Sequence, residues 1–245
     1  MGEEPHPILS SPGREILPWP QGCEHVLHLV QEQGPGVAAG VARFIAEGLE
    51  RGDAVVIIGA MERWRAHPAV RRAEAKFFDA RALLAGSRPG EALNSILAPV
   101  RARHRGVRVF SELTDLLWRR GDRVGALALE RRWNSLWGAP FSLTCACGLD
   151  ALDTSAYEGP LQALGALHTH LVPVADCGAF DEAVGQAIAE VLEPSLVRML
   201  HTLSAAHRPA MHMPTGVALL FWLKEHMPRT AEKVLARSRA RWTEH

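Results

Sequence analysis

The segment Ala54-Val-Val-Ile-Ile-Gly59 decides the fold. It is an apolar run of strand length, rich in β-branched residues, and Gly52-Asp53 precedes it as a turn. Such a run, without polar alternation, is typical of a strand that is buried on both faces.

The preceding segments extend this strand into a repeating unit. His25 to Val30 is a second apolar run of strand length, and residues 37–50 carry apolar side chains at helical spacing. A strand, a helix and a strand in this order predict parallel strands joined by a right-handed crossover.

The alternation continues toward the C-terminus. Further strands are expected at 76–79, 107–110 and 141–147, and helices at 91–104 and 114–137. We therefore predict an α/β fold with a mainly parallel central sheet of about five strands, covered by helices on both faces.

Both ends of the chain differ from this pattern. Residues 1–21 are rich in Pro, Gly and Ser and are expected to form a flexible lead-in. Beyond 178 no strand-like run remains, so 179–245 is predicted to be an all-helical C-terminal appendage. Pro194 is expected to kink or split its first helix, and Thr215 is a candidate cap for a later one.

Composition narrows the partners and the compartment. The 27 acidic and 27 basic residues balance, which gives no reason to expect nucleic acid or an anionic membrane as the main partner. Neither a secretory signal nor an apolar stretch of about 20 residues is present, so we expect a cytoplasmic protein. The few cysteines are irregularly spaced, as expected for reduced thiols: Cys23, Cys145, Cys147 and Cys177.

Taken together, several segments of the chain resemble the MEDS family, the sensory domain of methanogen and methylotroph regulators and of the dichloromethane regulator DcmR. The resemblance covers residues 22–178. It is carried by His25-Val26, Phe44 to Ile58, Phe78-Asp-Ala80, Val107 to Trp118, Leu129 to Leu136, Pro140 to Cys147 and His168 to Pro173. It implies a three-layer α/β sandwich, distantly similar to the KaiC/RecA ATPase core, that works as a signal-input module.

The loop Gly34-Pro-Gly-Val-Ala-Ala-Gly40 occupies the place of a P-loop, between the first strand and its helix. A working P-loop has Lys and Ser or Thr after its last glycine, whereas Val41-Ala42 follow here. An ordinary turn is the favoured interpretation, and binding of a nucleotide or phosphate without hydrolysis is the alternative. No cofactor is expected.

A small ligand is expected at the carboxyl edge of the sheet, where open α/β folds bind ligands. The candidate ligand-binding residues are His25, Gly34, Gly36, Ser111, Glu112, Asn134, Cys145 and Cys147. Each has a structural alternative. Ser111 and Glu112 could cap the following helix, Asn134 could bond a backbone carbonyl, and the two cysteines could be core residues.

Metal and nucleophile motifs give no clear signal. His168, His170, Asp176 and Cys177 suggest a metal site, as do His201, His207 and His212, but none has a recognised ligand spacing. No metal site is therefore predicted, and no serine-nucleophile motif is present either.

The last helix carries a basic stripe, with Arg229, Lys233, Arg237 and Arg241 at four-residue intervals. A solvated helix face is the favoured interpretation. Contact with a partner through Trp222, Arg229, Lys233, Arg237 and Trp242 is the functional alternative, and a homodimer is the expected assembly.

These observations predict a non-catalytic sensory or regulatory module that binds a small ligand or a protein partner, in signal transduction or transcriptional control. Two alternatives stay open. One is a divergent KaiC/RecA-type nucleotide-binding protein, and the other is a regulator whose basic C-terminal helix contacts DNA.

Overall fold

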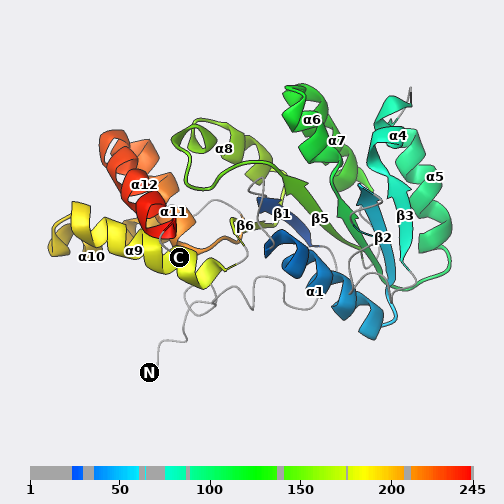
Figure 1. Ribbon diagram of the computed structural model, residues 1–245, viewed down its shortest axis with the longest axis horizontal. Coiled ribbons are helices and arrows are strands. Elements are labelled where there is room, and N and C mark those ends of the chain that lie inside the picture. The colour runs from blue at the N-terminus through cyan, green and yellow to red at the C-terminus, as the bar shows by residue number, and fades with distance from the viewer. Residues whose placement is uncertain are drawn as a thin grey trace.

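The computed structural model describes residues 24–29, 36–60, 64, 75–86, 89–136, 141–174, 176–206 and 211–243. Its centre is a six-stranded sheet in the order β3-β2-β4-β5-β1-β6, with every pair parallel (Figure 1). The strands are β1 (His25–Leu29), β2 (Ala54–Gly59), β3 (Lys76–Asp79), β4 (Val107–Ser111), β5 (Phe141–Cys147) and β6 (His170–Val172). The predicted α/β sheet is confirmed, with β2 in its interior.

Helices cover both faces of this sheet, which gives three layers. α1 (Gly36–Glu50) packs against Val55 and Ile57 of β2, whereas Val56 and Ile58 belong to the core on the other face. That second face is covered by α4 (Ala80–Ala85), α5 (Pro89–Arg101), α6 (Leu113–Arg119), α7 (Arg123–Ser135) and α8 (Pro160–Gly165), with a short 3-10 turn at Thr154–Tyr157. The alternation of side chains along β2 produces the two cores.

β6 was not predicted, because it has only three residues and begins with a polar one. Residues of the later chain extend its pairing: His212 forms an isolated parallel bridge with His170. The His212 N–H donates to the Thr169 carbonyl, and the Leu171 N–H donates to the His212 carbonyl, both at 2.8 Å. The edge of the sheet is thus joined directly to the C-terminal region.

Four helices follow: α9 (Cys177–Val191), α10 (Pro194–Ala206), α11 (Thr215–His226) and α12 (Pro228–Thr243). They lie beyond β6, at one end of the molecule (Figure 1). Their buried side chains, such as Phe180, Leu220 and Val234, share one continuous core with Leu27 of β1 and Leu171 of β6. The C-terminal helices therefore pack directly on the sheet domain.

The sequence predicted two details of these helices, a break at Pro194 and a cap at Thr215. α9 ends at Val191 and α10 begins at Pro194, so the predicted split is confirmed. Thr215 does not cap α11; instead, the carboxylate of Asp181 on α9 accepts hydrogen bonds from the Thr215 and Gly216 N–H groups at 3.2 and 2.7 Å. Burial, opposed by these two hydrogen bonds, raises the pKa of Asp181.

Within the described ranges, no helix has both the length and the apolar character that a membrane crossing requires.

A buried arginine ties α1 to the sheet. The side chain of Arg108, on β4, is 1% exposed; its Nε donates to the Asp53 carboxylate at 3.1 Å and its Nη1 to the Phe44 carbonyl at 2.8 Å. Glu47 lies 3.7 Å from the same Nη1. Gly48 is required here, because a Cβ at that position would lie 2.6 Å from the Arg108 side chain. This network pairs the buried charge with two carboxylates, although Arg108 Nη2 has no hydrogen-bond partner among the described residues.

Candidate functional site

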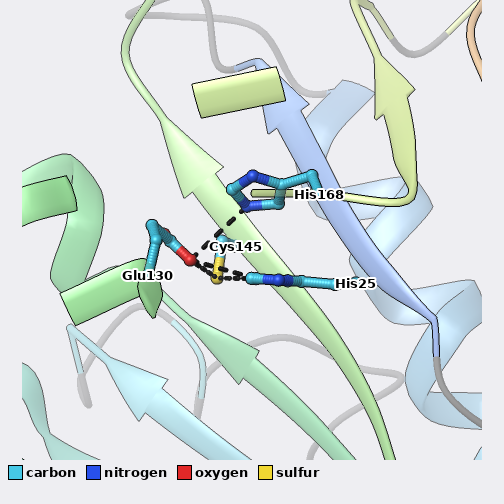
Figure 2. Close-up of side chains that lie close together, drawn as sticks. All are labelled: His25, Glu130, Cys145 and His168. Carbon is cyan, nitrogen blue, oxygen red and sulfur yellow. Dashed lines mark hydrogen bonds and ion pairs between the residues drawn. The ribbon is translucent and has the colours of Figure 1, made fainter. Parts of the chain in front are cut away.

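Four side chains with metal-ligating or titratable groups meet on the face of the sheet opposite α1 (Figure 2). His25 begins β1 and Cys145 lies in β5, on the same face, because His25 pairs in register with Leu143. Glu130 reaches down from α7, and His168 lies in the turn between α8 and β6. We call His25, Glu130, Cys145 and His168 the buried cluster, since all four side chains are excluded from solvent.

One carboxylate oxygen is the centre of the buried cluster. Glu130 Oε2 lies 3.0 Å from His25 Nε2, 3.5 Å from His168 Nε2 and 3.5 Å from Cys145 Sγ. The thiol is also 3.4 Å from His25 Nε2. Since the four ligand atoms all lie within 4.8 Å of one another, they surround a single point.

A second set of groups fixes the orientation of these side chains. His168 Nδ1 lies 2.7 Å from the Leu164 carbonyl, and His25 Nδ1 lies 3.0 Å from Asn134 Oδ1. The Asn134 amide is itself oriented, because its Nδ2 donates to the Leu167 carbonyl at 2.9 Å. A carbonyl and an amide oxygen can only accept, so Nδ1 carries a proton in both rings, and Nε2 of each ring faces Glu130.

The other oxygen of Glu130 is also held. Oε1 accepts a hydrogen bond from the Thr114 hydroxyl of α6, another fully buried side chain. Thr114 therefore leaves only Oε2 to face the two histidines and the cysteine. The outer groups come from α6, α7 and α8, so helices on one face of the sheet position the whole buried cluster.

The surroundings shift the pKa values in opposite directions. Burial tends to raise the pKa of Glu130, but the neighbouring His168 and His25 side chains and the hydrogen bond from the Thr114 hydroxyl outweigh it and lower that pKa. Burial, together with His25, lowers the pKa of His168 to about 4. Burial and the Glu130 carboxylate raise the pKa of the Cys145 thiol well above its ordinary value. At neutral pH, Glu130 is thus ionised, His168 is neutral and Cys145 is a thiol.

The arrangement contains the members of a Cys–His–Asn triad, since His25 contacts both Cys145 and Asn134. A nucleophilic cysteine needs a lowered pKa and partial exposure. Cys145 has the opposite properties: it is 0% exposed, its thiol pKa is raised, and a carboxylate oxygen lies 3.5 Å from its sulfur. The geometry therefore favours binding by the cluster over covalent catalysis by Cys145.

Three of the candidate ligand-binding residues come together in the structure, because His25 contacts both Asn134 and Cys145. His168 joins His25 and not the neighbouring His170. Asn134 bonds a backbone carbonyl, the favoured alternative, and a cluster side chain as well. The buried cluster also differs in place, because His25 lies at the amino end of β1 and not at the carboxyl edge of the sheet.

Glu130 was missed, although the sequence held a signal for it. The buried positions of α7 are Ala126, Leu129, Glu130 and Trp133, the stripe expected for a helix packed on a sheet. A glutamate within such a stripe must find partners inside the protein. That rule, applied to residues 126–133, would have marked Glu130 as a candidate.

The remaining ligand candidates lie elsewhere. Ser111 Oγ accepts from the Leu113 N–H at the start of α6. Glu112 accepts from the Ala60 N–H at 2.7 Å and from Trp64 Nε1 at 2.8 Å, and so holds the segment after β2. Cys147 belongs to the apolar core, where burial raises its pKa. Gly36 begins α1, and Gly34 lies outside the described residues.

The partner-binding candidates lie on α11 and α12. Arg229, Lys233 and Arg237 are exposed, as the solvated-face interpretation predicts. Trp222 stacks on His226 with ring centroids 4.5 Å apart, and Trp242 packs edge-on against Phe180 at 6.1 Å. The fourth member of the stripe, Arg241, instead bonds Gln186 and Glu190 on α9.

Comparison with known proteins gives no relative: no family model, no curated protein and no solved structure matches this chain. The resemblance to the MEDS family therefore stays a prediction. Function has to be argued from the buried cluster itself.

Proposed function

We propose that this chain is a sensory or regulatory module of the MEDS type, and that the buried cluster is its sensing centre. The observation that supports the proposal is the convergence of four ligating side chains on one point in the interior, each excluded from solvent. Turnover requires substrates to enter and products to leave, whereas a ligand that is sensed can be retained. An enclosed site therefore suits binding better than catalysis.

The position of the buried cluster supports a signalling role as well. Thr169 follows His168, and its hydroxyl and N–H bond the backbone of His25 at 2.8 to 3.0 Å. The Thr169 carbonyl accepts from His212, two residues before Pro214 and the start of α11. Hydrogen bonds thus connect the buried cluster with the C-terminal helices, so a ligand that moves His25 or His168 would bias the packing of α11.

Native mass spectrometry of the purified protein tests whether the buried cluster holds a ligand. We expect a mass excess in the wild type that is lost in Glu130→Gln and kept in Glu112→Gln. Glu112 is the matched control, because it too is a carboxylate that holds neighbouring elements together, but at the end of β2.

Amide hydrogen exchange tests the signalling part of the proposal. When the retained species is removed from the wild type, exchange should rise in β6 and at the start of α11. A change confined to the four cluster residues and their neighbours in sequence would contradict a sensory role. The proposed homodimer is tested separately, by light scattering of the same samples.

Nucleotide hydrolysis, the activity of the KaiC/RecA-type alternative, requires a working P-loop. The loop 34–40 is not followed by the lysine and the Ser or Thr of such a loop. We expect no magnesium-dependent ATP turnover. Turnover that disappears when Gly40 is replaced would favour the KaiC/RecA-type alternative instead.

A further inference from the structure

We propose that the buried cluster binds one divalent transition-metal ion of the zinc class, with His25 Nε2, His168 Nε2, Cys145 Sγ and Glu130 Oε2 as tetrahedral ligands. The proposal rests on the proposed function, because it names the ligand of the same sensing centre. It departs from the sequence-based expectation of no metal site, which relied on local ligand spacing.

The direction of the histidine lone pairs is the first argument. His168 donates its Nδ1 proton to the Leu164 carbonyl, so the neutral ring has a lone pair at Nε2. That Nε2 has no hydrogen-bond partner within the described residues, is fully buried, and faces a carboxylate oxygen 3.5 Å away. A lone pair aimed at an anion is unfavourable, and a cation between the two atoms makes the contact favourable.

The groups behind the ligands give the second argument. A histidine that binds a metal through one ring nitrogen usually donates the other ring N–H to a carbonyl or carboxylate. Here both rings do so, His25 to Asn134 Oδ1 and His168 to the Leu164 carbonyl. Thr114 similarly holds the Glu130 oxygen that does not face the centre.

The spacing of the ligand atoms is the third argument. Zinc–nitrogen and zinc–oxygen bonds of about 2.0–2.2 Å and zinc–sulfur bonds of about 2.3 Å place tetrahedral ligands about 3.3–3.6 Å apart. Four of the separations among the His25, His168, Cys145 and Glu130 ligand atoms run from 3.0 to 3.5 Å, and every pair of these atoms lies within 4.8 Å. Small side-chain rotations would therefore complete the coordination shell.

Charge balance is the fourth argument. A divalent ion together with the Glu130 carboxylate, a Cys145 thiolate and two neutral imidazoles sums to zero, which suits a site without solvent. The Cys145 thiol releases its proton to solvent as the sulfur–metal bond forms. Nitrogen and sulfur ligands select zinc or a similar borderline ion over magnesium or calcium, which prefer oxygen.

Cobalt(II) substitution of the full-length chain tests this proposal directly. After removal of bound metal with a chelator, one equivalent of Co²⁺ should produce a thiolate-to-cobalt charge-transfer band and the intense visible bands of a tetrahedral ion. Zn²⁺ should displace it with a stoichiometry of one per chain. This measurement uses the wild-type protein, so it does not depend on whether a variant folds.

Two matched pairs of variants assign the ligands. Cys145→Ser should abolish the charge-transfer band, whereas Cys177→Ser should keep it, because Cys177 is equally buried but contacts the Val174 carbonyl. His168→Gln should weaken Zn²⁺ binding at least a hundredfold, and His28→Gln should not. His28 is buried on the α1 face of the sheet, away from the buried cluster.

The outcomes separate this proposal from the proposed function. Absence of the cobalt bands in folded wild-type protein, or their equal loss in Cys177→Ser, would overturn the metal site. The sensing centre would survive that result if native mass spectrometry found another species that depends on Glu130. If the metal binds and hydrogen exchange in α11 is unchanged, the metal proposal stands and the sensory function fails.

Discussion

The two faces of the sheet bury charge in different ways. On the α1 face, Arg108 Nε donates to Asp53 and Nη1 to the Phe44 carbonyl, so these two donors meet acceptors, whereas Nη2 has no partner among the described residues. On the other face, His168 Nε2 lies 3.5 Å from the Glu130 carboxylate, while the proton of that ring is on Nδ1, where it meets the Leu164 carbonyl. Burial of a charged group alone therefore does not identify a binding site, whereas two buried acceptors that face each other, such as His168 Nε2 and the Glu130 carboxylate, indicate one.

The largest expected effect concerns the Arg108 network on the α1 face. Arg108→Met leaves Asp53 and Glu47 without their buried cation, which should lower the free energy of unfolding by about 3 kcal/mol. Arg43→Met is the control, because Arg43 forms a partly exposed pair with Glu47 within α1, and its loss should cost less than about 1 kcal/mol. Urea denaturation measures both. If both variants lose the same free energy of unfolding, the burial of Arg108 adds no stability to the network.

The stability of the face that carries the buried cluster should depend on the bound metal ion. Chelation of the bound ion should lower the melting temperature, and Zn²⁺ at about a hundred times its dissociation constant should restore about 2.7 kcal/mol. The same treatment of Cys145→Ser should change little, and Cys177→Ser should behave as the wild type. Differential scanning calorimetry gives the shifts. If neither the chelator nor zinc changes the melting temperature of the wild type, the two faces do not differ in this way.

The sheet and most helices were predictable, because their signals are local. Ala54 to Gly59 is a continuous apolar run, and the helix of residues 37–50 has a regular apolar stripe. β6 gave no such signal, since its three residues are defined by pairing with β1 and by the bridge to His212. Short strands at a sheet edge depend on long-range contacts that periodicity does not report.

The site was predictable only in part, for a related reason. His25, Cys145 and Asn134 were candidates individually, but the cluster residues come from four segments separated by 15 residues or more. Metal motifs are recognised from short spacings on one element, and this arrangement has none. What brings Glu130 over His25 is the register of β1 with β5 and the packing of α7, which no single segment encodes.

A smaller effect concerns a histidine on the α1 face. Both ring nitrogens of His28 are buried without a hydrogen-bond partner among the described residues, and burial lowers its pKa from 6.5 to about 4. The unfolded chain therefore binds a proton that the folded chain does not, so stability falls as the pH drops from about 6.5 toward 4. At pH 5, the loss relative to pH 8 is about 2 kcal/mol.

His28→Leu should remove this part of the acid sensitivity, whereas His104→Leu, at an exposed position, should keep it. Urea denaturation at pH 5 and pH 8 compares the three proteins. If His28→Leu loses as much stability on acidification as the wild type, His28 has a partner that keeps its charged form stable. The α1 face would then hold a second polar site.

The smallest expected effect belongs to Asn134, which contacts the buried cluster without being a proposed ligand. Its Oδ1 accepts from His25 and its Nδ2 donates to the Leu167 carbonyl, so two roles can be separated. Asn134→Ala should weaken Zn²⁺ binding about tenfold, because His25 loses the acceptor that orients its ring. Asn134→Asp should restore the affinity, since it keeps an acceptor for His25. It should not restore the melting temperature, because the Leu167 carbonyl still lacks its donor.

Chelator competition measures the zinc affinity and calorimetry the melting temperature, with Ser135→Ala as the control on the exposed side of α7. If Asn134→Asp binds zinc as weakly as Asn134→Ala, Asn134 acts through packing alone, and the orientation of His25 does not depend on its hydrogen bond.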